Sequence, residues 1–320
     1  MIYTINNCIR AFGYTNFDRL IADMGSVDNL KAYVIANGYA DIAVAEDTEL
    51  LLVDENGKET HTGCYGAKLN EYLCFTANRD SKVCIVQEGT PTDISKRKVI
   101  QYKINNGQWQ TLDLSTVSLT AGDKMYLKSD DTIPMSESAE IYKKFKTSNG
   151  IIDVSGNIMS LLNFSTSLTP YCFYRLFNYA NILRAQELEL PATTLAPNCY
   201  RSMFQNCTNL SIGPSILPAT ELAEGCYQAM FSSCFMYGDA KKAPELPATT
   251  LAQNCYNYMF SGCSKLNYVK AMFTDISAEG CLNGWLYNVS STGTLIKNKD
   301  ATWSNTDAMI PSGWTVQTEV

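Results

Sequence analysis

Cysteine and histidine are the residues with which this chain could bind a metal ion or form covalent cross-links. The sequence contains twelve cysteines but a single histidine, His61. A structural zinc site needs four thiolate or imidazole ligands, and usually includes two cysteines a few residues apart. No C-x2-C pair is present. The sequence therefore predicts no metal site.

Eight of the cysteines occupy two recurring positions of a repeat in the second half of the chain. Other copies hold Ala180 and Val289 at equivalent positions, so these positions accept small apolar side chains. We expect buried free thiols, and a ladder of disulfides between neighbouring copies is the alternative. The first position holds Cys172, Cys199, Cys226, Cys255 and Cys281, and the second holds Cys207, Cys234 and Cys263.

Residue patterns typical of catalysis are missing from the sequence. His61 lies in a polar stretch, without the nucleophile and orienting acid that a general base needs. Serine-hydrolase, phosphate-loop, zinc-protease and dinucleotide motifs do not occur. The acidic turn at residues 54–57 lacks the ligand spacing of a calcium loop. We predict no catalytic residue and no cofactor, and keep a glycan-cleaving enzyme with two carboxylates as an alternative.

A repeated phrase organises the second half of the chain. Its clearest copies, at residues 190–210, 217–237 and 246–266, read LPATTLAPNCYRSMFQNCTNL, LPATELAEGCYQAMFSSCFMY and LPATTLAQNCYNYMFSGCSKL. Degenerate copies surround Cys172 and Cys281. A repeat of 20 to 30 residues predicts a solenoid. Apolar residues at the first cysteine and four, five and eight positions later predict a short helix in each copy. Residues 183–188 and 266–272 are predicted strands.

The repeat phrase, followed by KLNYVKAMF (265–273) and IPSGWTV (310–316), resembles the BspA-like leucine-rich-repeat proteins of gut Bacteroidetes and of their crAss-like phages. GIIDVSGNIMSLL (150–162) is similar to the segment that leads into such repeats. The likeness covers about residues 150–320. It implies a leucine-rich-repeat solenoid used for adhesion and surface recognition, and it implies no catalytic residue.

The first half of the chain mixes helix and strand patterns. Residues 26–38 predict a helix, and residues 41–44 and 50–53 predict strands. Further strands are predicted at 73–77, 82–87, 99–104, 109–114 and 124–129, with a tight hairpin turn at Asn106-Gly107. We therefore predict an α+β multidomain chain: a small N-terminal α/β docking region (1–62), a β-sandwich (63–149) and a leucine-rich-repeat solenoid with a C-terminal cap (150–320).

Charge and hydropathy narrow the range of partners. A formal net charge of −7 disfavours binding to nucleic acid or to anionic lipid. No apolar run is long enough to insert into a membrane. The first residues contain no basic stretch followed by an apolar run, so we expect no export signal and synthesis in the bacterial cytoplasm.

Candidate ligand contacts are the residues that the predicted core leaves unconstrained. The residues two and three positions after each first cysteine vary between copies and should face solvent, as should several residues of the predicted strands. Tyrosine and arginine among them are common interface anchors. The candidates are Arg184, Gln186, Arg201, Tyr258, Asn267, Tyr268 and Lys270.

These patterns together favour a non-enzymatic phage virion protein, such as a head or tail fibre or a decoration protein. Its expected partners are other virion proteins and a glycan or protein of the host surface. A homotrimer is expected from the fibre interpretation, although no coiled-coil heptads are present. The alternative is an exported bacterial surface adhesin.

Overall fold

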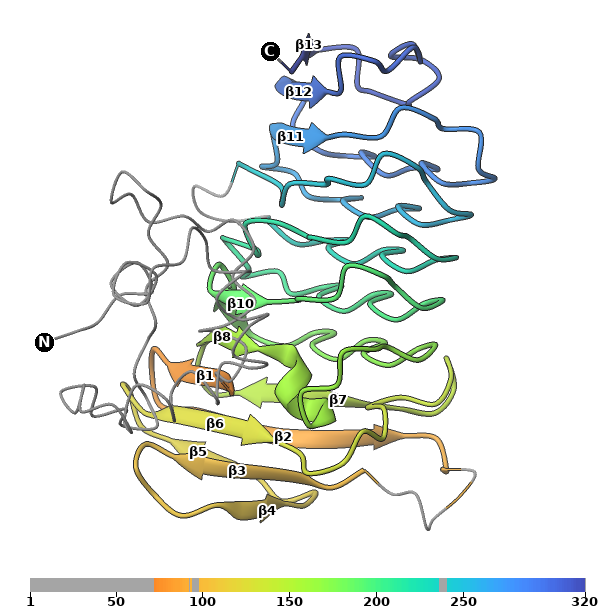
Figure 1. The fold of residues 1–320 in the computed structure, drawn as a ribbon. Coiled ribbons are helices and arrows are strands. Elements are labelled where there is room, and N and C mark those ends of the chain that lie inside the picture. Colours follow the sequence, from red (N-terminus) through yellow and green to blue (C-terminus); the bar gives the residue numbers. More distant parts are fainter. Residues whose placement is uncertain (1–71, 92, 94–97, 236–240, 320) are drawn as a thin grey trace, which may run out of the picture. The chain divides into compact units, whose positions relative to one another are not determined.

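The computed structural model describes residues 72–91, 93, 98–235 and 241–319. The docking region, helix and strands predicted within residues 1–62, together with His61, lie outside the described residues. Residues 72–320 form one compact unit. Within that unit, a β-rich part is followed by successive turns of chain that stack one on another (Figure 1).

Eight strands precede the repeats. They are β1 (Leu73–Ala77), β2 (Ser81–Glu88), β3 (Ile100–Ile104), β4 (Gln110–Leu112), β5 (Val117–Leu119), β6 (Lys124–Lys128), β7 (Tyr142–Ser148) and β8 (Ile152–Asn157). The five strands predicted in this part of the chain are confirmed; β1 has the predicted ends, and the ends of the other four are shifted. Alternation of buried and outward side chains, as in β6, made them recognisable.

The hairpin between β3 and β4 is confirmed, but its predicted turn is wrong. The two strands pair antiparallel, with Ile100 opposite Leu112. Positive φ was expected at Asn106 and Gly107, whereas it occurs one residue earlier, at Asn105 (φ 51°). Asn105 also hydrogen-bonds Asp123 and Lys124 through its side chain, so contacts outside the hairpin determine the turn.

The strands form two sheets that face each other. One has the order β10-β8-β1-β6-β3-β4, with β9 also paired to β8, and the other has the order β5-β2-β7. Phe75 of β1 packs edge-on against Phe145 of β7, with ring centroids 5.0 Å apart. A short 3-10 helix, η2 (Ile158–Leu162), follows β8. Its buried Ser160 hydroxyl accepts from Leu73 N–H and donates to Leu127 O, which secures η2 to β1 and β6.

Strand β8 connects the β-rich part to the repeats. It pairs antiparallel with β1 and parallel with β9 (Ile182–Arg184) and β10 (Leu188–Glu189), the first strands of the repeat region. One hydrophobic core runs through both parts, because Phe177 of the first repeat stacks on Phe145.

The segments predicted to be short helices are ribbons of successive turns. We call them ribbon segments 1 to 5: residues 171–180, 198–207, 225–234, 254–263 and 280–289. In every segment the residues one before, three after and seven after the first cysteine have φ between 51° and 77°. A right-handed helix cannot contain such residues. The apolar pattern follows a period of four residues, in which two consecutive residues face inward and the next two face outward. Because this period is close to the 3.6 residues of an α-helix, the sequence predicted helices here.

The four-residue period divides the backbone N–H groups into two sets. In segment 2, Arg201 N–H donates to Asn198 O three residues back, within the same turn. Its neighbour Tyr200 N–H donates instead to Cys226 O in segment 3. Each of segments 1 to 4 donates five such hydrogen bonds to the following turn. The turns are therefore held together by their backbones.

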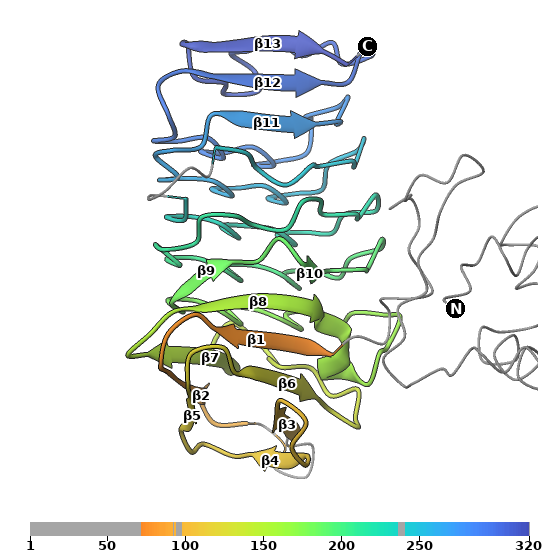
Figure 2. The same cartoon turned by 90° about the vertical axis from the view of Figure 1, so that its left-hand side faces the viewer.

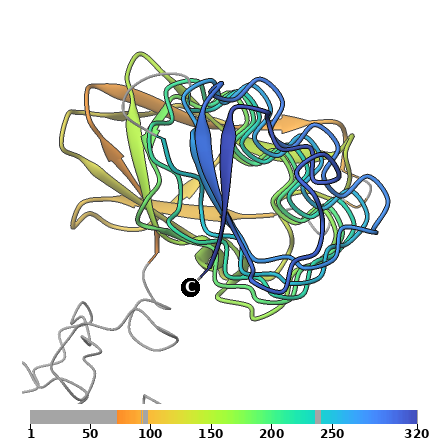
Figure 3. The ribbon, with the colours of Figure 1, turned by 90° about the horizontal axis from the view of Figure 1, so that it is seen from above.

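Columns of aromatic rings fill the interior of the stack. Phe173, Tyr200, Tyr227 and Tyr256 form one column, and Phe177, Phe204, Phe231 and Phe260 form the other. Neighbouring ring centroids within these columns lie 5.2 to 6.1 Å apart. Because each ring contacts its equivalent in the next turn, the side chains repeat with the backbone. Seen along the stack, the ribbon segments lie opposite the strands (Figure 3).

Different groups cover the two ends of the stack. At the first segment, Met135 N–H and Phe145 N–H donate to the carbonyls of Cys172 and Leu176. At the other end, β11 (Tyr268–Ala271), β12 (Gly293–Lys297) and β13 (Trp314–Thr318) form a parallel sheet (Figure 2). The indole of Trp285 there donates to Ala308 O. The β-rich part therefore satisfies backbone acceptors that the first ribbon segment exposes.

The predicted fold class is wrong for the described residues. Apart from η2 their elements are strands, with no α-helix among them, so the α+β assignment fails. A leucine-rich-repeat solenoid also fails, because the strands of successive repeats do not join into one continuous sheet. Between β10 and β11 the strand side is connected by isolated bridges such as Ile216 with Glu245. Ribbon hydrogen bonds supply the regular connection instead.

Stability should depend on glycine where a left-handed residue is also crowded. Gly225 has φ 57°, and a Cβ there would lie 2.6 Å from Asn198 Oδ1. We expect Gly225→Ala to lower the free energy of unfolding by about 1–3 kcal/mol, measured by urea denaturation. Ala229→Gly in the same segment, at φ 51°, is the matched control. It should stay within about 1 kcal/mol of the parent, because relief of strain offsets added chain entropy. If Gly225→Ala were as stable as the parent, residue 225 would not be both left-handed and crowded by Asn198.

Candidate functional site

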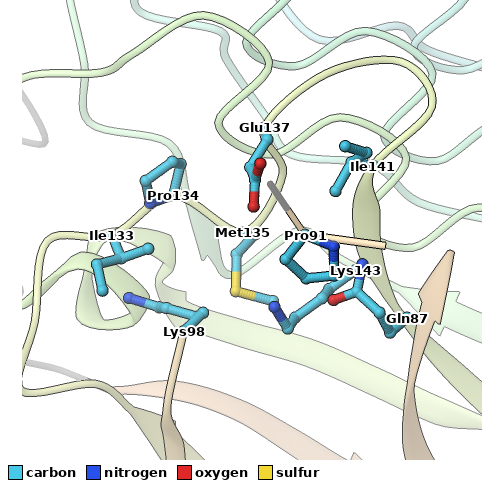
Figure 4. Close-up of a pocket in the computed structure, with 9 residues that line it drawn as sticks. All are labelled: Gln87, Pro91, Lys98, Ile133, Pro134, Met135, Glu137, Ile141 and Lys143. Atoms are coloured by element: carbon cyan, nitrogen blue, oxygen red, sulfur yellow. The ribbon is translucent and has the colours of Figure 1, made fainter. Parts of the chain in front are cut away.

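A small pocket beside β3 and β7 contains the ionisable residues Lys98, Glu137 and Lys143. It is lined by Gln87, Pro91, Lys98, Ile133, Pro134, Met135, Glu137, Ile141 and Lys143 (Figure 4). The buried Lys98 ammonium donates to Asp131 Oδ1 at 2.7 Å and to Asp131 O at 3.2 Å. Burial lowers the pKa of Lys98, and the hydrogen bond and charge of Asp131 oppose that shift. Lys98 thus anchors the loop after β6, and its ammonium is already engaged.

The repeat thiols are packing groups. All eight are buried, as predicted, and the ten cysteines of the described residues are free. The second column donates S–H hydrogen bonds to the preceding turn: Cys207 to Phe177 O and Cys234 to Phe204 O, both at 2.9 Å. Burial raises the pKa of the Cys172 thiol to about 11. Among the described residues, no group of three or more histidine, cysteine or acidic side chains could hold a metal ion.

The outward side of the ribbon segments is the most distinctive surface of the described residues. We call it the ribbon face, defined as the residues one before and two, three, six and seven after the first cysteine of each segment. These 25 positions hold five tyrosines, two arginines and no acidic residue; the others are Asn, Gln, Ser, Gly and Ala. Tyr179, Tyr258 and Tyr287 expose 70%, 51% and 61% of their surfaces. In a chain of net charge −7, this face is neutral to positive.

Backbone geometry accounts for only part of this composition. Asparagine and glycine are favoured at the left-handed positions, and there Asn198 lies over Gly225 and Asn254 over Gly280. The positions two and six residues after each cysteine are free of that constraint. They still hold no acidic residue, and they include Tyr174, Arg201 and Tyr287. The left-handed positions therefore do not by themselves explain the lack of acidic residues on the ribbon face.

The seven predicted contact residues lie on two different sides of the stack. Arg201 and Tyr258 belong to the ribbon face, where Arg201 is half-buried and Tyr258 is exposed. Arg184 and Gln186 are exposed at β9 and just after it, on the strand side. Asn267, Tyr268 and Lys270 lie at β11, also on the strand side, and each is half-buried. The structure thus does not bring the seven together into one site.

Ion pairs occupy much of the strand side around β11. Lys270 Nζ lies 3.6 Å from Glu245 and 2.9 Å from Glu319, and Lys242 Nζ lies 5.4 Å from the centre of the Tyr268 ring. These groups already have partners within the chain. Tyr179 and Tyr287, in contrast, are exposed on the ribbon face, but the sequence did not predict them as contacts. They lie seven and six residues after the first cysteine of their segments, and a helix would not place both of these positions on its outward side. The four-residue period was the signal that identifies them.

Comparison of the chain with protein-family models, curated proteins and solved structures gives no match. Of the helices in the described residues, none has the length and apolarity required to cross a bilayer. The ribbon face therefore has to be interpreted from its own chemistry.

Thiol reactivity provides a direct test of the packing of the stack. At pH 8 a thiol of pKa about 11 is ionised to about one part in a thousand, and thiolates are the reactive form. We expect iodoacetamide, followed by mass spectrometry, to label the repeat cysteines other than Cys281 at least about 100-fold more slowly in the folded protein than in urea. Half-buried Cys84 provides an internal comparison. Rapid labelling of Cys226 or Cys234 in the folded chain would contradict this packing.

Proposed function

We propose that this protein is a non-enzymatic structural protein of a phage virion, a head or tail fibre or decoration protein, that presents its ribbon face to a host-surface glycan or protein. The observation that carries the proposal is the ribbon face itself: three exposed tyrosines (Tyr179, Tyr258 and Tyr287) and two half-buried arginines among small polar residues, with no acidic side chain, over five stacked segments.

This composition resembles that of surfaces that recognise varied ligands. Tyrosine supplies a large amphipathic contact area at small entropic cost, and serine, glycine and asparagine supply adaptable hydrogen bonding. Tyr258 is held in place as well as exposed, because its ring lies directly over Gly284 of the next segment. A rigid anchor loses little conformational entropy on binding, which favours affinity.

The mechanism we propose is display on a rigid support. Each segment is hydrogen-bonded to the next, and segment 1 is hydrogen-bonded to the β-rich part. The ribbon face can then meet an extended ligand at several segments at once, and weak contacts add up. The likeness of the repeat phrase to proteins of Bacteroidetes and their phages supports the virion setting. A homotrimer, as expected for a fibre, remains part of this proposal.

Location is the first property to measure. We expect mass spectrometry of purified phage particles from the source to detect peptides that span the repeats, at a constant ratio to the major capsid protein. Particles banded twice by density, with host cytoplasmic proteins quantified alongside, control for contamination. Recovery only from bacterial surface fractions would replace the virion proposal with an exported adhesin that uses the same face.

Recognition by the ribbon face is tested with exposed tyrosines. We expect Tyr258→Ala and Tyr287→Ala each to weaken binding of the purified protein to host cells by about tenfold, the typical effect of removing an aromatic anchor. Leu114→Ala removes another exposed apolar side chain, in the β-rich part, and should bind like the parent.

Thermal unfolding of each variant separates loss of contact from loss of fold. A defect in Tyr268→Ala, with normal binding by Tyr258→Ala and Tyr287→Ala, would assign recognition to the strand side and refute the role of the ribbon face.

A further inference from the structure

Two arginines and four tyrosines gather where the first ribbon segments meet β7. We call this group the arginine–tyrosine cluster: Tyr142, Tyr171, Tyr174, Arg175, Tyr179 and Arg201. The Arg175 guanidinium lies 5.2 Å from the ring centre of Tyr174 and 5.6 Å from that of Tyr142. Tyr174 packs edge-on against Tyr142 and Tyr171. Tyr142 and Tyr174 are buried, but they do not belong to the main cluster of core residues.

The positive charges of both guanidinium groups affect the pKa of one phenol, that of Tyr174. Arg175 N–H donates to Arg201 O, so the two residues lie on adjacent turns. Burial raises the pKa of Tyr174, and the positive charges of Arg175 and Arg201 oppose that rise. Two positive charges on adjacent turns therefore lie near one phenol.

Neither arginine is neutralised by the described part of the chain. The ion pairs there are made by lysines, and no described carboxylate lies within 4.0 Å of either guanidinium. Arg175 donates from Nη1 to Tyr142 Oη at 3.3 Å, while its buried Nε has no partner. Arg201 donates from Nη1 to Asn198 Oδ1 at 3.3 Å. A guanidinium has five donors, so most of this hydrogen-bonding capacity is unused.

We propose that the arginine–tyrosine cluster binds an acidic glycan, a sugar chain that carries carboxylate or sulfate groups. The acidic group would accept charge-assisted hydrogen bonds from Arg175 and Arg201, the planar donors best suited to it. Tyr179, 70% exposed beside Arg175, offers a ring on which the C–H face of a sugar can lie. This inference rests on the proposed recognition role of the ribbon face and specifies its ligand.

The net charge of the protein supports an acidic ligand at this position in particular. The chain as a whole is acidic and repels anions at long range. Anion binding is favoured where cations are present and acidic groups are lacking. The ribbon-face positions of segments 1 and 2 hold two arginines and no acidic residue. A neutral glycan would use the tyrosines but would leave the paired arginines without a role.

The test measures binding of three hexasaccharides to the full chain by calorimetry: oligogalacturonate, chondroitin sulfate and neutral cellohexaose. We expect at least one acidic sugar to bind, more weakly as NaCl rises, and cellohexaose to bind at least tenfold more weakly. Oligogalacturonate carries carboxylates alone, whereas chondroitin sulfate carries both carboxylates and sulfates. Binding of chondroitin sulfate without binding of oligogalacturonate would therefore assign the contact to sulfate. Arg201→Gln should weaken acidic-sugar binding about 10- to 100-fold, and Arg201→Lys should restore part of it.

Arg79→Gln removes an exposed arginine from the turn after β1 and is the matched control, expected to bind like the parent. Equal binding of neutral and acidic sugars, no binding of any sugar, or equal effects of Arg201→Gln and Arg79→Gln would overturn the inference. The same variants are then compared in the host-cell assay. Cell binding that depends on Tyr258 but not on Arg201 would refute the acidic glycan while the recognition role stands.

Discussion

Alternation of hydrogen bonding along the ribbon segments is the constraint on which the repeat region depends. Every second N–H closes a turn within its own segment, and the others pair with the following segment. This division requires a left-handed residue every four positions, which costs about 1 kcal/mol or more wherever the residue is not glycine. Hydrogen bonds between segments and the stacked aromatic columns offset that cost. A single turn has neither partner, so the segments are stable only as a stack.

The same constraint separates the interior from the surface. Because two residues face inward and the next two outward, the cysteines and aromatic rings fall into columns along the stack, and so do the outward residues. At the left-handed positions the side chain of one turn reaches over the next, as Asn198 does over Gly225. A glycine then leaves room for the side chain of the preceding turn, as at Gly225 and Gly284. This geometry accounts for residues such as Asn198 and Gly225 at the left-handed positions, but not for Arg201 and Tyr287, which lie at other positions of the ribbon face.

The sequence predicted five of the eight strands of the β-rich part, helped by alternation of apolar and polar residues in strands such as β6, and did not predict β5, β7 or β8. It misassigned the ribbon segments because apolar residues at the first cysteine and four, five and eight positions later fit a helix as well as a four-residue period. The residue that could have distinguished the two is the one directly after that cysteine, which is Tyr200, Tyr227 or Tyr256. It is buried next to the cysteine, as a four-residue period with two consecutive inward residues requires. Arg201 and Tyr258 were found from their variability, but the contribution of Tyr142 in β7 depends on tertiary contacts that no local pattern encodes.

The position of the arginine–tyrosine cluster follows from how the stack begins. Segments 2 to 5 receive hydrogen bonds from a preceding ribbon segment, whereas segment 1 receives them from Met135 and Phe145 of the β-rich part. Only this junction places a β7 side chain, Tyr142, beside the ribbon face. Adding or removing later repeats would lengthen or shorten the face without creating or destroying the cluster. The length of the stack and the specificity of the site can therefore change independently.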